Sequence, residues 1–504
     1  MESWFAVIFF AVLAGLYFFF HLLTVLLRPK NGYPGKLPPG PVGLPLLGHL
    51  HMLGDHPPRN LQRLAKEYGP IMFIRLGLIP TMVVSSAKAA ELFLKTHDAI
   101  FASRPTLQVA DLISYGQKNL IFAKYGSYWR NIRKLCTIEL LSSSKIEMFK
   151  PMRREEVLGF VQSVKIASDS QSMIDVSLKI QSLIDGMTYR MIFGFKDHRF
   201  NIKSSIQESV ALAGAFNLAD YIPFFRALDF QGLGRRMKAC HKVLDEFLEK
   251  IIDEHERDDK YLQGEHKDFI HVMLSLMKSN NTRELHLDRD NIKAIILDMI
   301  GAAMDTSSTA IEWVIAELLK NPRVMKLVQE ELENVIGLER MVKETDLIKL
   351  SYLKMVIMES MRIHPVAPLL IPHQSIEDIT VDGYFIPNKS IVLINAWAIG
   401  RDPNVWSSNV DEFYPERFIG TTIDVQGHDF QLLPFGSGRR KCPGMQLGLT
   451  VAQLVLAQLV HCFNLALPDG MSPEDLDMTE KFGLTLPRAN HLMAIPTYRL
   501  RMNL

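Results

Sequence analysis

The chain has 504 residues, of which 48% are hydrophobic and 22% are charged, as expected for a protein that buries a sizeable core. Lysine and arginine number 56 and aspartate and glutamate 55, so the composition gives no electrostatic case for nucleic-acid binding. No two of the four cysteines lie close together, which argues against a zinc ribbon, an iron–sulfur cluster and a disulfide-rich secreted fold. A cysteine with a metal role here would act as a single thiolate. The four are Cys136, Cys240, Cys442 and Cys462.

The chain starts with an apolar segment, since residues 4–27 contain no Lys, Arg, Asp or Glu. As a helix this segment would span roughly 36 Å, enough to cross a bilayer core of about 30 Å. It is too long for the apolar region of a signal peptide, and Arg28, Lys30 and Lys36 follow it directly. The positive-inside bias then predicts a single transmembrane anchor over residues 1–27, with the rest of the chain in the cytosol. A buried core helix is the alternative.

A proline-rich hinge is expected over residues 28–48. It contains Leu-Pro-Pro-Gly-Pro at residues 37–41, with Pro34 and Pro45 on either side. Prolines this dense cannot continue a helix and favour a stiff, extended spacer, which would fix how the rest of the chain meets the membrane. A plain linker is the alternative.

Residues 49–504 contain no internal repeat, and their pattern predicts one mainly helical domain with small β-sheets (α+β). Amphipathic periodicity predicts helices over residues 62–68, 129–141, 152–164, 206–213, 237–253 and 323–335. Alternating apolar runs predict strands over residues 71–76, 81–85, 379–381 and 391–396. The charge-rich stretch 253–267 is interpreted as a surface connection rather than a domain boundary.

The residues 435–444 read Phe-Gly-Ser-Gly-Arg-Arg-Lys-Cys-Pro-Gly and precede an apolar run to about residue 460, which predicts a buried helix. Pro443 suits the first turn of that helix, so we expect Cys442 at its N-terminus, where N–H groups and the macrodipole stabilise a thiolate. The glycines let the backbone approach a large flat ligand closely, and Arg440 suits an anionic carboxylate. Each feature is weak alone, because an isolated cysteine is usually a small buried hydrophobic residue.

Glu359 and Arg362 stand three residues apart on a predicted helix that ends before Pro365. At this spacing they share one helix face and can form an ion pair. The alternative is a surface salt bridge worth at most about 1 kcal/mol.

A long helix is predicted over residues 289–319, closed by Asn321-Pro322, and it would extend for roughly 46 Å. Asp305 and Thr306 lie in its middle. A buried mid-helix hydroxyl can also simply bond back to a preceding carbonyl and bend the helix. The pattern alone therefore does not separate a structural role from a chemical one.

Taken together, these motifs resemble the cytochrome P-450 family. Phe435, Gly438, Arg440, Cys442 and Gly444 match its haem-binding signature position for position. The resemblance implies the cytochrome P-450 fold, with one large haem domain. It also implies that the Cys442 thiolate binds the iron of haem b and that Arg440 pairs with a haem propionate.

The resemblance extends to the other two motifs. Glu359 and Arg362 match the family's Glu-x-x-Arg, which is buried with Arg417 of the later Pro-Glu-Arg-Phe at residues 415–418. Such a triad is structural, and losing one buried partner should prevent haem incorporation. Asp305 and Thr306 match the acid–alcohol pair that delivers protons during oxygen activation.

Further residues are implied only by the resemblance. Ala303 replaces the family's usual glycine beside the oxygen groove, which leaves less room there. Trp129 and Arg133 match a Trp-x-x-x-Arg pattern that contacts haem propionates. His373 lies where the family often has another propionate partner.

The chain looks most like the plant microsomal branch, given the hinge, Phe-Ala-Ser-Arg-Pro at 101–105 and Phe-Gly-Leu-Thr at 482–485. This implies a single-pass protein of the endoplasmic reticulum membrane that hydroxylates a lipophilic small molecule. It would use O2 and NADPH electrons delivered by a partner reductase.

Residues 366–371 have no polar side chain, which suits a lipophilic substrate. We expect a sesquiterpene or similar terpenoid first and an aromatic phenolic, of biphenyl or phenylpropanoid type, second. A haem-thiolate isomerase or dehydratase and a non-catalytic haem sensor are the rival functions. The Asp305-Thr306 pair argues against both, because neither rival needs to deliver protons to oxygen.

Overall fold

A computed structural model describes residues 4, 7, 8, 10–18, 32–195, 202–257, 268–278, 287–407, 409–468 and 470–502. Backbone contacts divide the chain into two compact units. The first unit comprises Met1–Gln108, Phe216–Arg235 and Leu369–Ile399, and the second comprises Val109–Ala215, Arg236–Pro368 and Gly400–Leu504. A single domain over residues 49–504 stays a prediction.

Of the expected anchor, residues 10–18 are helical and their side chains are exposed. Phe10 is 67% exposed and Phe18 is 74% exposed. Residues 19–27 lie outside the described residues, as do residues 258–267 of the predicted surface connection.

The proline-rich segment is joined by hydrogen bonds to other parts of the first unit. The Pro39 carbonyl accepts a hydrogen bond from the Phe73 N–H at 2.9 Å, and the Lys36 carbonyl accepts one from the Phe385 N–H at 2.7 Å. A Cβ on Gly40 would meet the Phe73 carbonyl oxygen at 1.9 Å, so only glycine fits at this crossing.

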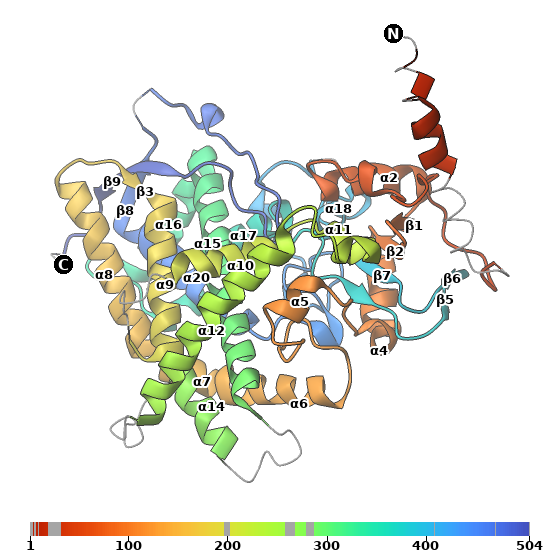
Figure 1. Ribbon diagram of the computed structural model, residues 1–504. Coiled ribbons are helices and arrows are strands. Elements are labelled where there is room, and N and C mark those ends of the chain that lie inside the picture. The colour runs from red at the N-terminus through yellow and green to blue at the C-terminus, as the bar shows by residue number, and fades with distance from the viewer. Residues whose placement is uncertain are drawn as a thin grey trace. The chain divides into compact units, whose positions relative to one another are not determined.

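The first unit contains a four-stranded sheet with the order β1-β2-β7-β4. Figure 1 labels three of its strands, β1, β2 and β7. β1 (Ile71–Leu76) pairs antiparallel with β2 (Ile79–Val84), β2 pairs parallel with β7 (Ile391–Ile394), and β7 pairs antiparallel with β4 (His373–Gln374). A hairpin of β5 (Ile379–Val381) and β6 (Tyr384–Ile386) completes the strands described there. The helical elements of this unit are η1 (Leu50–Met52), α2 (Pro57–Tyr68), α3 (Ala87–Glu91), η2 (Leu92–Thr96), α4 (Asp98–Phe101), α11 (Leu218–Tyr221), η4 (Pro223–Arg226) and α18 (Ala396–Ile399).

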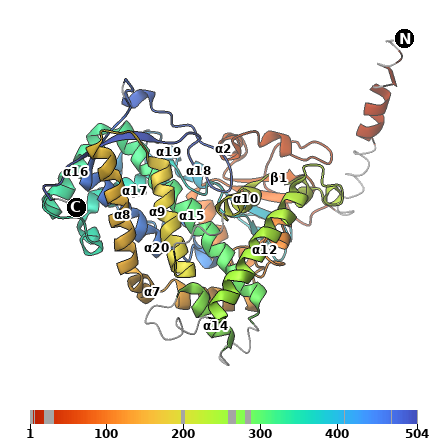
Figure 2. The same ribbon diagram turned by 60° about the vertical axis from the view of Figure 1, so that its left-hand side comes forward.

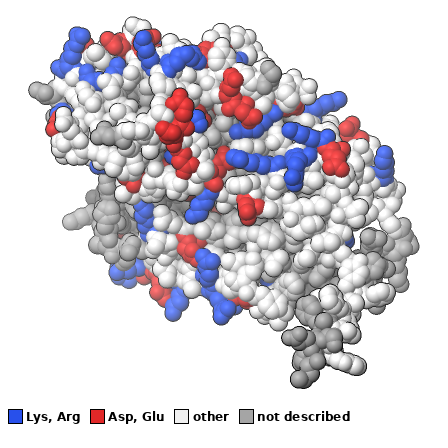
Figure 3. Space-filling view, turned by 90° about the horizontal axis from the view of Figure 1, so that it is seen from above, with Lys and Arg blue, Asp and Glu red and all other residues white. Residues whose placement is uncertain are grey.

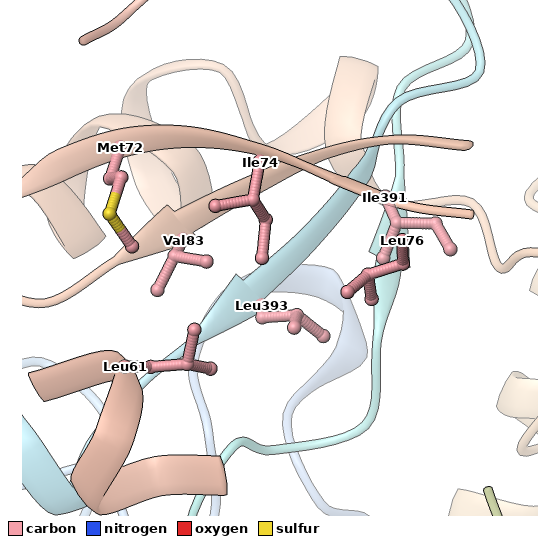
Figure 4. Packing of buried hydrophobic residues seen from close by; sticks show 7 residues of the cluster. All are labelled: Leu61, Met72, Ile74, Leu76, Val83, Ile391 and Leu393. Atoms are coloured by element: carbon pink, nitrogen blue, oxygen red, sulfur yellow. The ribbon is translucent and has the colours of Figure 1, made fainter. Parts of the chain in front are cut away.

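The core of the first unit forms where α2 covers the sheet, as Figure 4 shows. Alternate residues of a strand share a face, so β1 directs three apolar side chains to the same side. The cluster consists of Leu61, Met72, Ile74, Leu76, Val83, Ile391 and Leu393, each at most 7% exposed.

The second unit is mainly helical. Its helices are α6 (Ser127–Leu135), η3 (Cys136–Leu140), α7 (Ser143–Met148), α8 (Lys150–Asp169), α9 (Val176–Phe193), α10 (Lys203–Gly214), α14 (Phe269–Lys278), α15 (Arg289–Lys320), α16 (Pro322–Ile336), η6 (Glu344–Lys349), α17 (Ser351–Ile363), α19 (Pro403–Trp406), η7 (Pro415–Phe418), η8 (Gly438–Arg440), α20 (Met445–Cys462) and η9 (Pro473–Asp475). A small sheet has the order β3-β9-β8, with β3 (Ile174–Asp175), β9 (Met493–Tyr498) and β8 (Phe463–Ala466). α5 (Gln108–Leu112) and α12 (Leu233–Arg257) each contain a boundary between the units.

The long helix α15 organises the second unit. Its N-terminus is closed by a capping box between Asp288 and Asn291, and it ends at Asn321 before Pro322. α9, α17 and α20 pack against it (Figure 2). α15 and α20 are long and apolar enough to cross a membrane. In the most apolar 18-residue stretch of each helix, however, 50% and 61% of the stretch is buried, as in core helices.

The helices and strands predicted from periodicity are confirmed, although the ends of most of them differ from the prediction. The helix predicted over 129–141 begins at Ser127, and its last part, Cys136–Leu140, is a π-helix. The strand predicted over 391–396 stops at Ile394, because the Asn395 side chain accepts a hydrogen bond from the Ala398 N–H at 3.1 Å and starts α18. β2 spans Ile79–Val84 rather than 81–85.

A buried ion-pair network joins α17 to η7 in the second unit. Glu359 and Arg362 are 0% and 1% exposed, and two hydrogen bonds of 2.8 Å join their side chains. Glu359 also accepts from Arg417 Nε at 2.8 Å and from the Tyr414 N–H at 2.9 Å. Arg362 donates further to the carbonyls of Gly400, Val410 and Glu412. The exposed salt bridge considered for Glu359 and Arg362 is therefore excluded by geometry.

We predict that Glu359→Gln destabilises the protein by about 3–5 kcal/mol, because it leaves two buried guanidinium groups without their carboxylate. The change should be measured as a lower thermal unfolding midpoint and a lower yield of haem-loaded protein. Glu330→Gln is the matched control. It removes an exposed pair with Lys326, 3.7 Å apart at i,i+4, and should cost at most about 0.5 kcal/mol. Equal midpoints for the two variants would contradict the prediction.

Candidate active site

The cysteine motif forms a tight loop before α20. Lys441 N–H donates to the Gly438 carbonyl at 3.1 Å, and Cys442 N–H donates to the Phe435 carbonyl at 2.9 Å. Gly438 has φ +66°, a left-handed conformation that favours glycine. α20 starts at Met445 with Gly444 as N-cap, so the expectation that Pro443 lies in its first turn is wrong. The reason is the bond from Cys442 to Phe435, which holds this part of the chain in the loop.

The half-buried Cys442 thiol experiences opposing electrostatic effects. Burial raises its pKa, whereas the N–H groups of Gly444 and Met445 and the charges of Arg133 and Lys441 lower it. Burial is the largest of these effects, so without a further positive charge the pKa of the thiol lies above its ordinary value. A metal cation on the sulfur would supply the missing favourable charge. The residues present therefore fit a single-thiolate metal site.

Cationic and aromatic side chains gather beside this loop. Arg133 on α6 donates to the Lys441 carbonyl at 2.5 Å. The Arg440 guanidinium stacks 4.1 Å from the centre of the Trp129 ring. It donates to the Leu120 and Ala123 carbonyls. Two guanidinium groups beside a cysteine loop suit a cofactor that carries carboxylates.

Like Arg133 and Arg440, the other two expected propionate partners bond to backbone carbonyls. The Trp129 indole N–H donates to the Leu120 carbonyl at 3.0 Å. His373 lies on β4 of the first unit, where its Nδ1 bonds to the Phe101 carbonyl at 2.9 Å. The haem-binding roles of all four residues stay predictions.

The middle of α15 is more open than the rest of this helix. Ala302 is exposed and Asp305 and Thr306 are half-buried, whereas most of the helix toward either end is buried. The Thr306 hydroxyl donates back to the Ala302 carbonyl at 2.5 Å, the mid-helix bond considered above. Burial raises the pKa of the Asp305 carboxyl, and the Thr485 hydroxyl that donates to it acts in the opposite direction.

Thr485 is a site residue that the sequence did not single out. It is 7% exposed, and 180 residues separate it from Asp305. The string Phe-Gly-Leu-Thr at 482–485 marked the branch of the family, but no local pattern connects it to α15. Only the fold shows that its threonine reaches the acid.

The segment that carries Thr485 is held from three directions. The Leu486 N–H donates to the Val366 carbonyl at 2.9 Å, and the Leu486 carbonyl accepts from Trp313 Nε1 at 2.7 Å. A Cβ on Gly214, at the end of α10, would meet the Leu484 nitrogen at 2.3 Å. α10, α15 and the chain near Val366 therefore meet around Thr485.

Comparison with known proteins agrees with this arrangement. The family profile described as Cytochrome P450 matches residues 38–493. Cytochrome P450 CYP736A12 of Panax ginseng is 58% identical over 92% of this chain and 94% of its own length. Desmethyl-deoxy-podophyllotoxin synthase of Sinopodophyllum hexandrum is 42% identical over 95% of this chain and 94% of its own length.

A solved structure is also similar. A zebrafish cytochrome P450 structure with abiraterone superimposes with a TM-score of 0.73 at 26% identity, covering 88% of this chain and all of the other. The expected haem cofactor, with NADPH electrons delivered through a reductase, follows from this family and fold. The chain therefore belongs to the cytochrome P450 family and is a haem-thiolate monooxygenase.

Proposed function

We propose that this enzyme hydroxylates a small lipophilic plant metabolite, a sesquiterpene or related terpenoid. The observation that carries the proposal is the apolar character of the segments around Asp305. Val366 and Ala367 on one segment and Leu484 and Leu486 on the other have no polar side-chain atoms. The hydroxyl of Thr485 already donates to Asp305. Apolar walls with few polar groups favour a hydrocarbon skeleton over a substrate that needs a hydrogen-bond partner.

Haem, when bound, supplies the electron-transfer and oxygen-activating chemistry. In the proposed arrangement Cys442 holds the iron. Arg440 of the cysteine loop and Arg133 beside it would hold propionates together with Trp129.

Asp305 and Thr306 would handle protons. Because burial raises the pKa of Asp305, its carboxyl holds a proton closer to neutral pH than an exposed aspartate does. The Thr306 hydroxyl is a donor and an acceptor, so it can pass a proton on while its oxygen stays near the Ala302 carbonyl. The hydroxyl of Thr485 would orient the carboxyl of Asp305.

Replacing Thr485 tests this proton relay. Thr485→Val removes the donor that lowers the pKa of Asp305, so that pKa should rise further. The acid then stays protonated to higher pH, and the alkaline limb of product formed per NADPH consumed should move to higher pH. Thr485→Ser keeps the donor and should retain the original profile. Superimposable profiles for the parent and both variants would contradict the role of Thr485.

The substrate class is tested by incubating microsomes that contain the enzyme and its reductase with sesquiterpenes and with biphenyl-type or phenylpropanoid phenolics. We expect NADPH-dependent hydroxylated products from the sesquiterpenes, identified by mass spectrometry. Thr306→Ala should lower product per NADPH by about 10²-fold or more, the lower range for proton transfer by a positioned side chain. Turnover of the phenolics alone would transfer the function to that class, and turnover of neither would reject both.

We further infer that residues 1–27 anchor the protein in the endoplasmic reticulum membrane, with the catalytic part in the cytosol. The absence of Lys, Arg, Asp and Glu from residues 4–27 and the exposed apolar side chains of residues 10–18 support this proposal. Figure 3 shows positive and negative side chains interspersed on one face, in keeping with the formal net charge of +1. An anchor of this kind would therefore depend on apolar burial rather than on overall charge.

Alkaline extraction of microsomes tests the anchor. The full chain should stay in the membrane pellet, because roughly 20 apolar residues bury in the bilayer core. A chain without residues 1–27 should move largely to the supernatant. Release of the full chain by the same wash would contradict a membrane-spanning anchor.

A further inference from the structure

We propose that Asp298 of α15 is a positioning residue for the haem site. Through residues 119–123 it fixes the Trp129–Arg440 pair, which would hold the cofactor's carboxylates. The inference rests on the proposed haem-binding roles of Trp129 and Arg440 and adds a residue that no sequence motif points to.

Asp298 binds one short segment of chain with both carboxylate oxygens. Its side chain is buried, at 8% residue exposure, and Oδ1 accepts from the Asn119 amide at 2.7 Å. Oδ2 accepts from the N–H groups of Leu120 at 2.7 Å and Ile121 at 2.9 Å. Asn119, itself 0% exposed, accepts from the Phe122 N–H at 3.1 Å. One carboxylate and one amide therefore fix the backbone of residues 119–122.

The carbonyl groups of the same segment bind Trp129 and Arg440. The Leu120 carbonyl accepts from Trp129 Nε1 at 3.0 Å and from Arg440 at 3.3 Å, and the Ala123 carbonyl accepts from Arg440 at 2.5 Å. Leu120 thus connects Asp298, through its N–H, with Trp129 and Arg440, through its C=O. A shift of this residue would move the acceptor that both side chains share.

A carboxylate is an expensive group to bury for packing alone. Burial raises the pKa of Asp298 to about 7, although the three donors act to lower it. An apolar side chain would fill the same space without that desolvation cost. What the carboxylate adds is direction, since it accepts from three donors of one segment and fixes their orientation.

A second contact, between Lys118 just before this segment and the start of α15, provides a matched control. The Lys118 ammonium pairs with Asp288 at 2.7 Å and Asp290 at 3.2 Å, and all three side chains are at least 36% exposed. These ion pairs tether the chain before Asn119 to the start of α15. The Lys118 side chain donates to Asp288 and Asp290 rather than to the Leu120 or Ala123 carbonyl. Loss of tethering and loss of positioning can therefore be separated.

The experiment compares four haem-loaded proteins: the parent, Lys118→Gln, Asp298→Asn, and the double variant Asp298→Asn with Asn119→Asp. In the Asp298→Asn protein one carboxylate oxygen is replaced by an NH2 group. This NH2 group must face either the Asn119 NH2 group or the N–H groups of Leu120 and Ile121, so a donor faces a donor in both orientations. In the double variant the side chain at position 298 donates to the side chain at position 119, the reverse of the parent. Oxygen atoms still accept from the N–H groups of Leu120, Ile121 and Phe122.

Haem transfer to apomyoglobin should be about tenfold faster from Asp298→Asn than from the parent, the scale expected for a lost hydrogen bond to a charged group. Its resonance Raman propionate-bending bands should also shift. Lys118→Gln should remain within about twofold of the parent, as expected for an exposed ion pair. The double variant should restore both the rate and the bands.

The positioning role is rejected if Asp298→Asn and Lys118→Gln release haem equally and share the parent's Raman bands, or if the double variant is as impaired as the single one. If Asp298→Asn alone does not fold, the double variant decides: parent-like haem release supports the role and failure to fold rejects it. The carbon-monoxide difference spectrum of the reduced parent separates this outcome from a failure of the haem-thiolate assignment. A red-shifted band there leaves the proposed function standing when only the variants disagree.

Discussion

The structure around the active site depends on keeping one cysteine ionisable in a place that disfavours charge. Burial raises the pKa of Cys442, and the groups that oppose this effect come from two directions, the start of α20 and the cation Arg133 on α6. The backbone bond from Cys442 to Phe435 holds the cysteine before the helix begins. Arg133 bonds to the carbonyl of the neighbouring Lys441, so its charge is fixed beside the sulfur. Loop, helix and cation thus act on the same sulfur, and a metal cation there would add to their effect.

Three carboxylates of the second unit, of which Glu359 and Asp298 are buried and Asp305 is half-buried, differ in their partners. Glu359 accepts from two guanidinium groups and a backbone N–H, so its carboxylate faces two positive charges. Asp298 accepts only from neutral donors, and burial raises its pKa. Asp305 also has a raised pKa and accepts from the Thr485 hydroxyl, a weaker stabilisation of its charge. Environments that differ in this way assign different tasks to chemically identical groups.

Much of this fold follows from local sequence patterns, but the contacts that complete the site do not. The amphipathic helices and the alternating strands were found because their periods are properties of short windows. α9 was missed because residues on all its faces, including Asp185 and Thr188, are buried, which removes the contrast between polar and apolar faces. The cysteine motif located the sulfur, yet not the start of α20, which depends on a hydrogen bond across the loop. Thr485 and Asp298 act on partners 177 to 180 residues away, and no periodicity reports such distances along the chain.

The helix α15 explains how these distant partners can act together. Asp298 and Asp305 are seven residues apart, close to two helical turns, so they project from nearly the same face. The first holds the segment behind Trp129 and Arg440, and the second meets Thr485. Because the helix between them is capped at its start and packed on α9, α17 and α20, it fixes the spacing between these two contacts. One rigid element therefore sets both the position of the segment that holds Trp129 and Arg440 and the position of the acid.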